Sequence, residues 1–248
     1  MATLFISDLH LSLKRPEKLD DFKQLLRGPA RNTNAVYILG DLFEEFWVGI
    51  DDSTPPNKEI VNELQDFTRN GPPLYILKGN RELLLDEIFY SMTGAIKLSD
   101  RTVIILNGKR VLLMHGDLLC TRDYKYQRFR QFMVNPVIKA IIKILPYSLR
   151  IWLSHGLRPA MNRSVMEKSE KIMDVEQPEV ELTMHKNDVT ELIHGHTHRP
   201  GMHKFEIAGV VNQRIVLGDW YSESQILVCK EDTRRLVPVR EYLQEHTD

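Results

Sequence analysis

The sequence predicts an α/β protein in which mixed sheets pack together and are flanked by helices. In the first half of the 248-residue chain, short apolar runs alternate with segments of helical periodicity, which is the pattern of an α/β sheet. The last third adds further strand-like runs, RIVLG and QILVC. Several of the apolar runs break off directly into Asp, Asn or His, which are side chains that bind metals.

Two helices are expected between the first strands, over EKLDDFKQLLR and NKEIVNELQDFTRN, because each segment places four apolar residues on one helical face. Gly71, followed by two prolines, should end the second helix. The pair Asn107 and Gly108 stands between two apolar runs and predicts a β-hairpin within residues 102–114. The two apolar faces consist of Leu19, Phe22, Leu25 and Leu26, and of Ile60, Val61, Leu64 and Phe67.

The segment 121–180 lacks strand patterning, and its stretch VIKAIIKILPYSLRIWL is apolar with sparse cations. A basic, apolar helical segment is typical of a surface for anionic lipid, a helical lid or a partner-binding face, whereas a core-packed helical pair with solvated lysines is the alternative. Its position between the strands that precede His115 and His196 favours a lid. We therefore expect a core of residues 1–120 and 181–248 and a helical insertion of residues 121–180 over the site.

The composition excludes several classes of protein. The formal net charge of −1 gives no indication of nucleic-acid binding. Cys120 and Cys229 form neither a zinc-type spacing nor a disulfide framework, which favours a reducing compartment. The first residues already form a strand-like run and do not resemble a secretory signal. No apolar stretch is long enough for a membrane span. No obligate protein partner is inferred.

Five apolar runs end in candidate metal ligands. Ligands bind beyond the carboxyl ends of the strands in open α/β sheets, so these side chains are expected to converge. A mixture of Asp and His suits Mn, Fe or Zn better than Ca. Two cations about 3.5–4 Å apart can clamp a phosphoryl group and lower the pKa of a bound water. The expected ligands are Asp8, His10, Asp41, Asn80, His115, His196 and His198.

Each motif by itself has a plain structural alternative. A Gly followed by Asp or Asn after an apolar run is usually a turn. The run HGHTH is more specific, because a turn has no need for three imidazoles within five residues. Within that run, His194 falls at the end of the strand, where a structural role is an alternative to metal binding. The combination of the motifs therefore carries the prediction.

The motifs together resemble those of the calcineurin-like metallophosphoesterases, and they follow that family's order: Asp8-x-His10, Gly40-Asp41-x-x-Glu44, Gly79-Asn80-Arg81-Glu82, His115-Gly116-Asp117 and Gly195-His196-x-His198. The resemblance implies a four-layer αββα sandwich with two metals. Mn²⁺ is the expected cofactor, two ions per chain, with Fe or Zn as alternatives. One ion would take Asp8, His10, Asp41 and His198, and the other Asp41, Asn80, His115 and His196.

A closer resemblance within that family is carried by TLFISDLHL, YILGDLFE, GNRE, VLLMHGDLLCTRD, IMDV and LIHGHTHRP. These segments resemble those of the family members that act in lipid A synthesis. Those enzymes hydrolyse the diphosphate of a UDP-linked diacylated glucosamine, giving UMP and the diacylglucosamine 1-phosphate. The resemblance implies that the insertion holds the acyl chains. It also implies a cytoplasmic protein in peripheral contact with anionic lipid on the cytoplasmic face of the inner membrane.

The same resemblance implies the residues that act on the substrate. A guanidinium binds phosphoryl oxygens in a fork geometry, which suits Arg81, although a surface pair with Glu82 is the alternative. Asp117 is expected to orient a metal-binding histidine. The expected catalytic residues are Arg81, Asn80 and His196, and the expected substrate-binding residues are Asn80, Arg81, Asp123, Lys168 and His196.

Three positions depart from the closer pattern. Glu82 stands where Asp is usual, and Met161 and Val165 stand where Ser and Asn are common. These departures leave open a paralogue that acts on another nucleotide diphosphate or phosphodiester. A non-catalytic scaffold is a further alternative, which the complete set of expected ligands disfavours.

Overall fold

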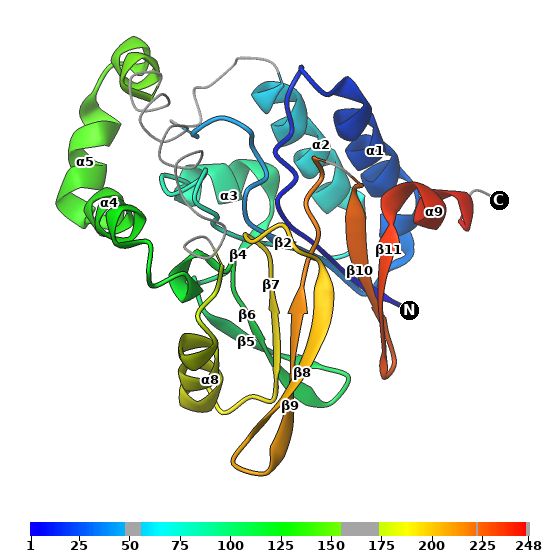
Figure 1. The fold of residues 1–248 in the computed structure, drawn as a ribbon. Coiled ribbons are helices and arrows are strands. Elements are labelled where there is room, and N and C mark those ends of the chain that lie inside the picture. The colour runs from blue at the N-terminus through cyan, green and yellow to red at the C-terminus, as the bar shows by residue number, and fades with distance from the viewer. Residues whose placement is uncertain (48–55, 155–173, 222, 247–248) are drawn as a thin grey trace.

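The structure is a computed structural model, and it describes residues 1–47, 56–154, 174–221 and 223–246. Two sheets pack against each other, and helices cover their outer faces (Figure 1). The α/β class with sandwiched sheets and flanking helices, expected from the sequence, is therefore confirmed.

The first sheet has six strands in the order β11-β10-β1-β2-β3-β4. Strands β1 to β4 are parallel, so their carboxyl ends lie at one edge. Strand β10 is antiparallel to β1, and β11 is antiparallel to β10. The strands are β1 (Thr3–Ile6), β2 (Ala35–Leu39), β3 (Leu74–Leu77), β4 (Ile96–Lys97), β10 (Gln225–Lys230) and β11 (Thr233–Pro238).

The second sheet has five strands in the order β5-β6-β7-β9-β8, of which β6, β7 and β9 are parallel. The expected hairpin joins β5 to β6, with Asn107 at φ 50° and Gly108 at φ 78°, as a tight hairpin turn requires. The strands are β5 (Thr102–Leu106), β6 (Lys109–Leu113), β7 (Glu191–His194), β8 (Gly201–Ile207) and β9 (Val210–Val216).

Both expected helices form, and all eight of their predicted apolar residues are buried. They cover the first sheet together with α3 and α9, while α8 covers the second sheet (Figure 1). The helices are α1 (Pro16–Arg27), α2 (Asn57–Asn70), α3 (Glu87–Thr93), α4 (Tyr124–Val134), α5 (Pro136–Ile144), α8 (Gln177–Lys186) and α9 (Val239–Gln244), with 3₁₀ turns η1 (Pro29–Asn32) and η2 (Asp117–Leu119).

Successive residues of the central strands belong to different layers of the core. In β1, Leu4 and Ile6 pack into the cluster beneath the helices of the first sheet, whereas Phe5 lies in the cluster between the two sheets. This alternation follows from the period of two in a strand. It explains why the central parallel strands read as continuous apolar runs, since both of their faces are covered.

The described part of the expected insertion projects beside the sheets as α4, α5 and a helical stretch at 147–154 (Figure 1). Helix α5 has no buried residue, and Val137 and Ile144 are 63% and 80% exposed, so α5 is not a core-packed helix. Helix α8 differs, because its Val180 and Met184 are buried against the second sheet. The expected insertion boundary at residue 180 therefore falls inside a helix that packs on the core.

Three residues of the sequence-based predictions, Met161, Val165 and Lys168, lie outside the described residues. Among the residues that are described, none of the helices has the length and apolar character needed to cross a bilayer.

Replacing Phe5 with Ala should destabilise the protein by about 3–5 kcal/mol, the usual result when a fully buried aromatic ring is removed from a core. The Phe5 ring is 0% exposed and stacks on Tyr37 with ring centroids 4.8 Å apart, in the cluster that joins the two sheets. Urea unfolding measures the effect. The matched control is Ile105→Ala on β5, which is 65% exposed and should cost less than about 0.5 kcal/mol.

Candidate metal centre

Each expected metal ligand lies in a loop that directly follows a strand. Asp8 and His10 follow β1, Asp41 follows β2, and the remaining ligands follow β3, β6 and β7. Five of the seven have positive φ values, between 45° and 72°, a backbone conformation that costs energy for residues other than glycine. Such strain concentrates at functional sites, and here it turns the side chains of several loops toward one volume.

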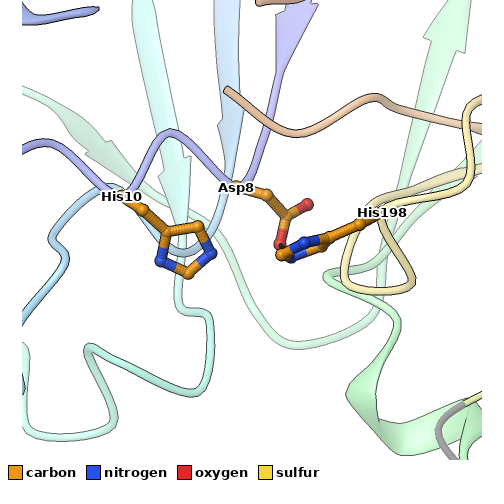
Figure 2. Close-up of side chains that lie close together, drawn as sticks. All are labelled: Asp8, His10 and His198. Atoms are coloured by element: carbon orange, nitrogen blue, oxygen red, sulfur yellow. Dashed lines mark ion pairs between the residues drawn. The ribbon is translucent and has the colours of Figure 1, made fainter. Parts of the chain in front are cut away.

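The first group of converging side chains is Asp8, His10 and His198 (Figure 2). One ligand atom from each lies within 4.8 Å of the others. Nε2 of His198 is 3.4 Å from Oδ1 of Asp8, and Nε2 of His10 is 3.6 Å from Oδ2 of Asp41. Asp41 thus approaches this group from the neighbouring strand, as the first predicted metal set requires.

The second group is tighter and is built around Asn80. Its Oδ1 lies 3.0 Å from Nε2 of His115 and 3.1 Å from Nδ1 of His196, and these two ring nitrogens are 3.2 Å apart. Oδ1 of Asp41 lies 3.7 Å from Nε2 of His115. The two oxygens of Asp41 therefore face different groups, which is the arrangement that a bridging carboxylate needs.

The ring orientation of His115 indicates that a cation fits the second group. The carbonyl oxygen of Leu39 can only accept, so Nδ1 of His115 donates to it, at 2.8 Å. In a neutral imidazole, Nε2 then carries a lone pair, and this lone pair faces the Asn80 oxygen. Two acceptors that face each other repel unless a positive charge lies between them. Ligand bonds of about 2.0–2.2 Å to one ion also place neighbouring ligand atoms about 3.0–3.5 Å apart.

Unpaired buried atoms indicate that a cation also fits the first group. Oδ1 of Asp8 and both ring nitrogens of His10 are buried and have no hydrogen-bond partner among the described residues. Buried polar atoms are normally satisfied, so converging nitrogen and oxygen atoms without partners fit the binding of a cation. The mixture of imidazole nitrogen and carboxylate oxygen suits Mn, Fe or Zn.

The carboxylates of the centre favour positive charge on His115 and His198, whereas burial lowers the pKa values of His10 and His196. Burial alone would raise the pKa of Asp8, but the neighbouring imidazoles of His198, His115 and His10 hold it well below its usual value. Burial likewise would lower the pKa of His115, but Asp41 and Asp8 raise it to about 9. The carboxylates thus stabilise a cation in their midst, which is a proton when no metal competes for the imidazoles.

Glu82 holds two loops of the centre together through backbone hydrogen bonds, a role that the sequence did not reveal. It is 1% exposed, and its carboxylate accepts hydrogen bonds from the backbone N–H groups of Asp41 (2.9 Å), Phe43 (2.9 Å) and Gly79 (3.2 Å). It therefore ties the loop after β2 to the loop after β3. This bonding excludes the alternative that Glu82 serves as the surface partner of Arg81.

Arg81 lies at the edge of the centre. Its backbone N–H donates to Oδ1 of Asp41 at 3.0 Å, and its guanidinium Nε is buried without a hydrogen-bond partner among the described residues. Asp123 is placed farther along the chain as the N-cap of α4, where its side chain accepts from the N–H of Tyr126. The position of Lys168 lies outside the described residues.

Two other residues of the sequence motifs, Asp117 and His194, make contacts that differ from those of the metal ligands. Asp117 was expected to orient a metal-binding histidine, but its carboxylate accepts from Arg130 and Tyr126, and Leu39 holds His115 instead. That expectation is corrected. His194 is fully buried, and its Nδ1 donates to the carbonyl oxygen of Gly195 at 2.8 Å, in agreement with a structural role.

Asp219 is a further residue of the site that was not expected from the sequence, and its Oδ2 lies 3.2 Å from Nδ1 of His198. This contact directs Nε2 of the ring toward Asp8, the usual function of a carboxylate behind a ligand histidine. A signal was available, because VLGD at residues 216–219 repeats the pattern ILGD at residues 38–41.

Known proteins are similar to this chain over most of its length. Residues 1–200 match the model of the family described as calcineurin-like phosphoesterase. The chain is 44% identical over 232 residues to UDP-2,3-diacylglucosamine hydrolase of Vibrio parahaemolyticus, covering 94% of this chain and 96% of that protein. It is 40% identical over 236 residues to the enzyme of the same name from Aeromonas hydrophila, covering 95% and 98%. Among solved structures it is similar to a phosphoesterase from E. coli, at 16% identity and a TM-score of 0.49, covering 97% and 94%.

Replacing Gly195 with Ala should reduce metal binding, because a Cβ there would lie 2.2 Å from both Oδ2 of Asp8 and Oγ of Ser7. The carboxylate of Asp8 would have to move. We expect a loss of at least about tenfold in Mn²⁺ affinity, as for other disturbances of ligand geometry. Metal titration measures the loss. Gly201→Ala is the control, because its Cβ would meet only the end of the His203 side chain, at 3.3 Å. Equal affinity in the two variants would contradict the assignment of Asp8 as a ligand.

Proposed function

The chain belongs to the calcineurin-like phosphoesterase family, and on that premise we propose that it hydrolyses the diphosphate bond of UDP-2,3-diacylglucosamine in lipid A biosynthesis. The products are 2,3-diacylglucosamine 1-phosphate and UMP. The observation that carries the proposal is the 44% identity, over nearly the full length of both chains, to a protein named for that substrate. The names of the relatives do not favour the alternative of a paralogue with another nucleotide or diester substrate.

Two divalent cations fit the two groups of ligands, and we assign them as Mn²⁺. Asp8, His10, Asp41 and His198 would hold one ion, and Asp41, Asn80, His115 and His196 the other. When bound, the pair supplies Lewis-acid polarisation of the phosphoryl group and a water of lowered pKa. The protein contributes the fixed arrangement of the ligands, which Glu82 and the strained loops maintain.

Arg81 is the residue that we assign to the substrate diphosphate. Arg81 lies in the loop that carries Asn80, and the Nε atom of its guanidinium is buried without a hydrogen-bond partner among the described residues. A guanidinium keeps its charge at any working pH and binds two phosphoryl oxygens at once, so it stabilises the charge that develops during transfer. We assign supporting substrate contacts to Asn80 and His196 in the centre, and to Asp123 and Lys168 in the insertion.

The insertion would accommodate the apolar part of the substrate. Phe129 of α4 packs edge-on against Phe46 of the core, with ring centroids 6.1 Å apart, so apolar side chains of the insertion meet the segment that follows β2. Helix α5 and the stretch 147–154 then expose large apolar side chains, including Ile144 at 80% and Trp152 at 69%. Cations such as Lys139 and Lys143 accompany them. Acyl chains and anionic head groups are ligands of this chemistry.

We propose on the same grounds that the protein is cytoplasmic and attaches peripherally to the cytoplasmic face of the inner membrane. A substrate with two acyl chains resides in a bilayer, so the enzyme must reach it there. An exposed apolar helix with flanking lysines can insert into the interface and attract anionic lipid.

The direct test is turnover of UDP-2,3-diacylglucosamine by the purified protein with and without Mn²⁺, with the products identified by mass spectrometry. We expect UMP and the lipid 1-phosphate, and loss of turnover when a chelator removes the metal. Arg81→Lys should lower kcat/KM by about 10²-fold with unchanged metal content, because an ammonium cannot form the forked contact.

Metal-independent turnover would overturn the proposed mechanism, and release of other products would overturn the proposed function. Arg69→Lys serves as the matched control, since Arg69 is a largely exposed arginine of α2 whose partner, within the described parts of the chain, is Asp66 in the same helix turn. It should leave kcat/KM unchanged.

Membrane attachment is tested by sedimentation with vesicles that contain phosphatidylglycerol. Binding should weaken as salt is added, because screening reduces the attraction of exposed lysines to anionic lipid. Ile144→Asp on α5 should weaken binding at low salt, since it places a charge at the apolar surface. Val211→Asp on β9, also an exposed apolar position at 67%, is the control and should bind as the unmodified chain does. Equal binding to neutral vesicles would argue against the proposal.

A further inference from the structure

Helix α4 is joined to the metal-site loop by a buried network of charges. Asp117 lies two residues after His115, and Oδ2 of its carboxylate accepts from Nε of Arg130 at 2.8 Å and from the hydroxyl of Tyr126. Nη2 of Arg130 continues the network to Oδ2 of Asp100, at 2.7 Å. The side chains of Asp117 and Arg130 are 4% and 9% exposed, so the pair is shielded from solvent.

This network anchors α4, a helix whose apolar contacts with the core include the buried Met133 and Phe129, which packs against Phe46. The only buried residues of α4 are Arg130 and Met133, and α5, which follows it, has none. A further polar contact runs from Nε2 of Gln127 to the carbonyl oxygen of Asp117 at 2.7 Å. Helices of a globular core are normally held by an apolar face. Here a directional ion pair contributes to that role.

We propose that Asp117 and Arg130 are positioning residues, which set the place of α4 beside the metal centre and thereby determine the affinity for the lipid substrate. The inference rests on the proposed function. A buried ion pair adds little net stability but imposes a defined geometry, because either charge left alone in the interior is unfavourable. It is therefore suited to hold a projecting helix in one orientation.

The pair acts on the helix and leaves the metal ligands in place. The ring of His115 is held by the Leu39 carbonyl, and neither oxygen of Asp117 bonds to a ligand histidine among the described residues. The start of α4, in contrast, adjoins the site, with the rings of Tyr126 and His196 6.3 Å apart. A shift of α4 would therefore change the surface that meets the nucleotide lipid before it changed the phosphoryl chemistry.

The experiment compares two substrates in the Mn²⁺-loaded enzyme: UDP-2,3-diacylglucosamine and a small chromogenic phosphodiester. Arg130→Met should raise KM for the lipid substrate at least about tenfold, while kcat for it and hydrolysis of the small diester stay within about twofold. Arg130→Lys keeps the charge, and its KM for the lipid substrate should lie between those of the unmodified enzyme and Arg130→Met. Arg128→Met removes an exposed cation of the same helix and is the matched control, with no expected change in KM.

Two results would overturn the proposal. An unchanged KM in Arg130→Met would show that the pair does not position α4, and an equal loss for both substrates would place its effect on the metal centre. If Arg130→Met fails to fold, Asp100→Asn removes only the outer, 45% exposed partner and should raise KM in the same direction by a smaller factor.

A second measurement separates this inference from the proposed function. Amide hydrogen exchange in residues 124–134 should become faster in Arg130→Met and stay unchanged in Arg128→Met, with no substrate present. If the unmodified enzyme cleaves the small diester but not the lipid substrate, the proposed function fails, and the exchange rates still decide whether the pair anchors α4. Equal exchange in the two variants would contradict the anchor.

Discussion

The carboxylate of Asp41 is the contact on which the rest of the site depends. One of its oxygens faces the group that contains His10, and the other faces the group that contains His115. The carboxylate can do so only because the backbone of the neighbouring loop, at Gly79, approaches it very closely. A Cβ on Gly79 would lie 2.1 Å from Oδ1 of Asp41. Glycine at this position is therefore a steric requirement of the shared carboxylate, and Glu82 holds the two loops in that contact through their N–H groups.

The two-sheet architecture makes this contact possible. Asp8, Asp41 and Asn80 come from parallel strands of the first sheet, whereas His115, His196 and His198 come from the second. Only the packing of the sheets through Phe5, Leu113 and Ile193 brings both sets of strand ends to one place. The rigid core thus fixes the positions of the site residues. The buried strands that precede the loops stabilise the strained backbone conformations of those loops.

The insertion follows a different physical principle. The core is held by apolar surface buried on both faces of its strands, whereas α4 and α5 expose apolar surface and are joined to the core by charges and hydrogen bonds. Under the proposed function these helices meet the lipid substrate, and an apolar face that meets lipid cannot also be buried against the protein. A polar anchor at their base resolves this conflict, because the apolar side chains then stay available for the substrate.

The sequence alone determined the class of the fold, the two helices α1 and α2, the hairpin at Asn107 and the set of side chains suited to bind metal. These features depend on local periodicity, on turn chemistry and on the donor atoms of single residues, all of which the sequence displays directly. The order of the strands, the buried role of Glu82, the help that Asp219 gives to His198, and the pairing of Asp117 with Arg130 were decided only by the tertiary structure. Each of these depends on which distant segments meet and on which atom of a side chain faces its neighbour. Such contacts are set by the packing of the whole core. A local pattern can mark a residue, as VLGD marks Asp219, but it does not show which distant side chain that residue meets.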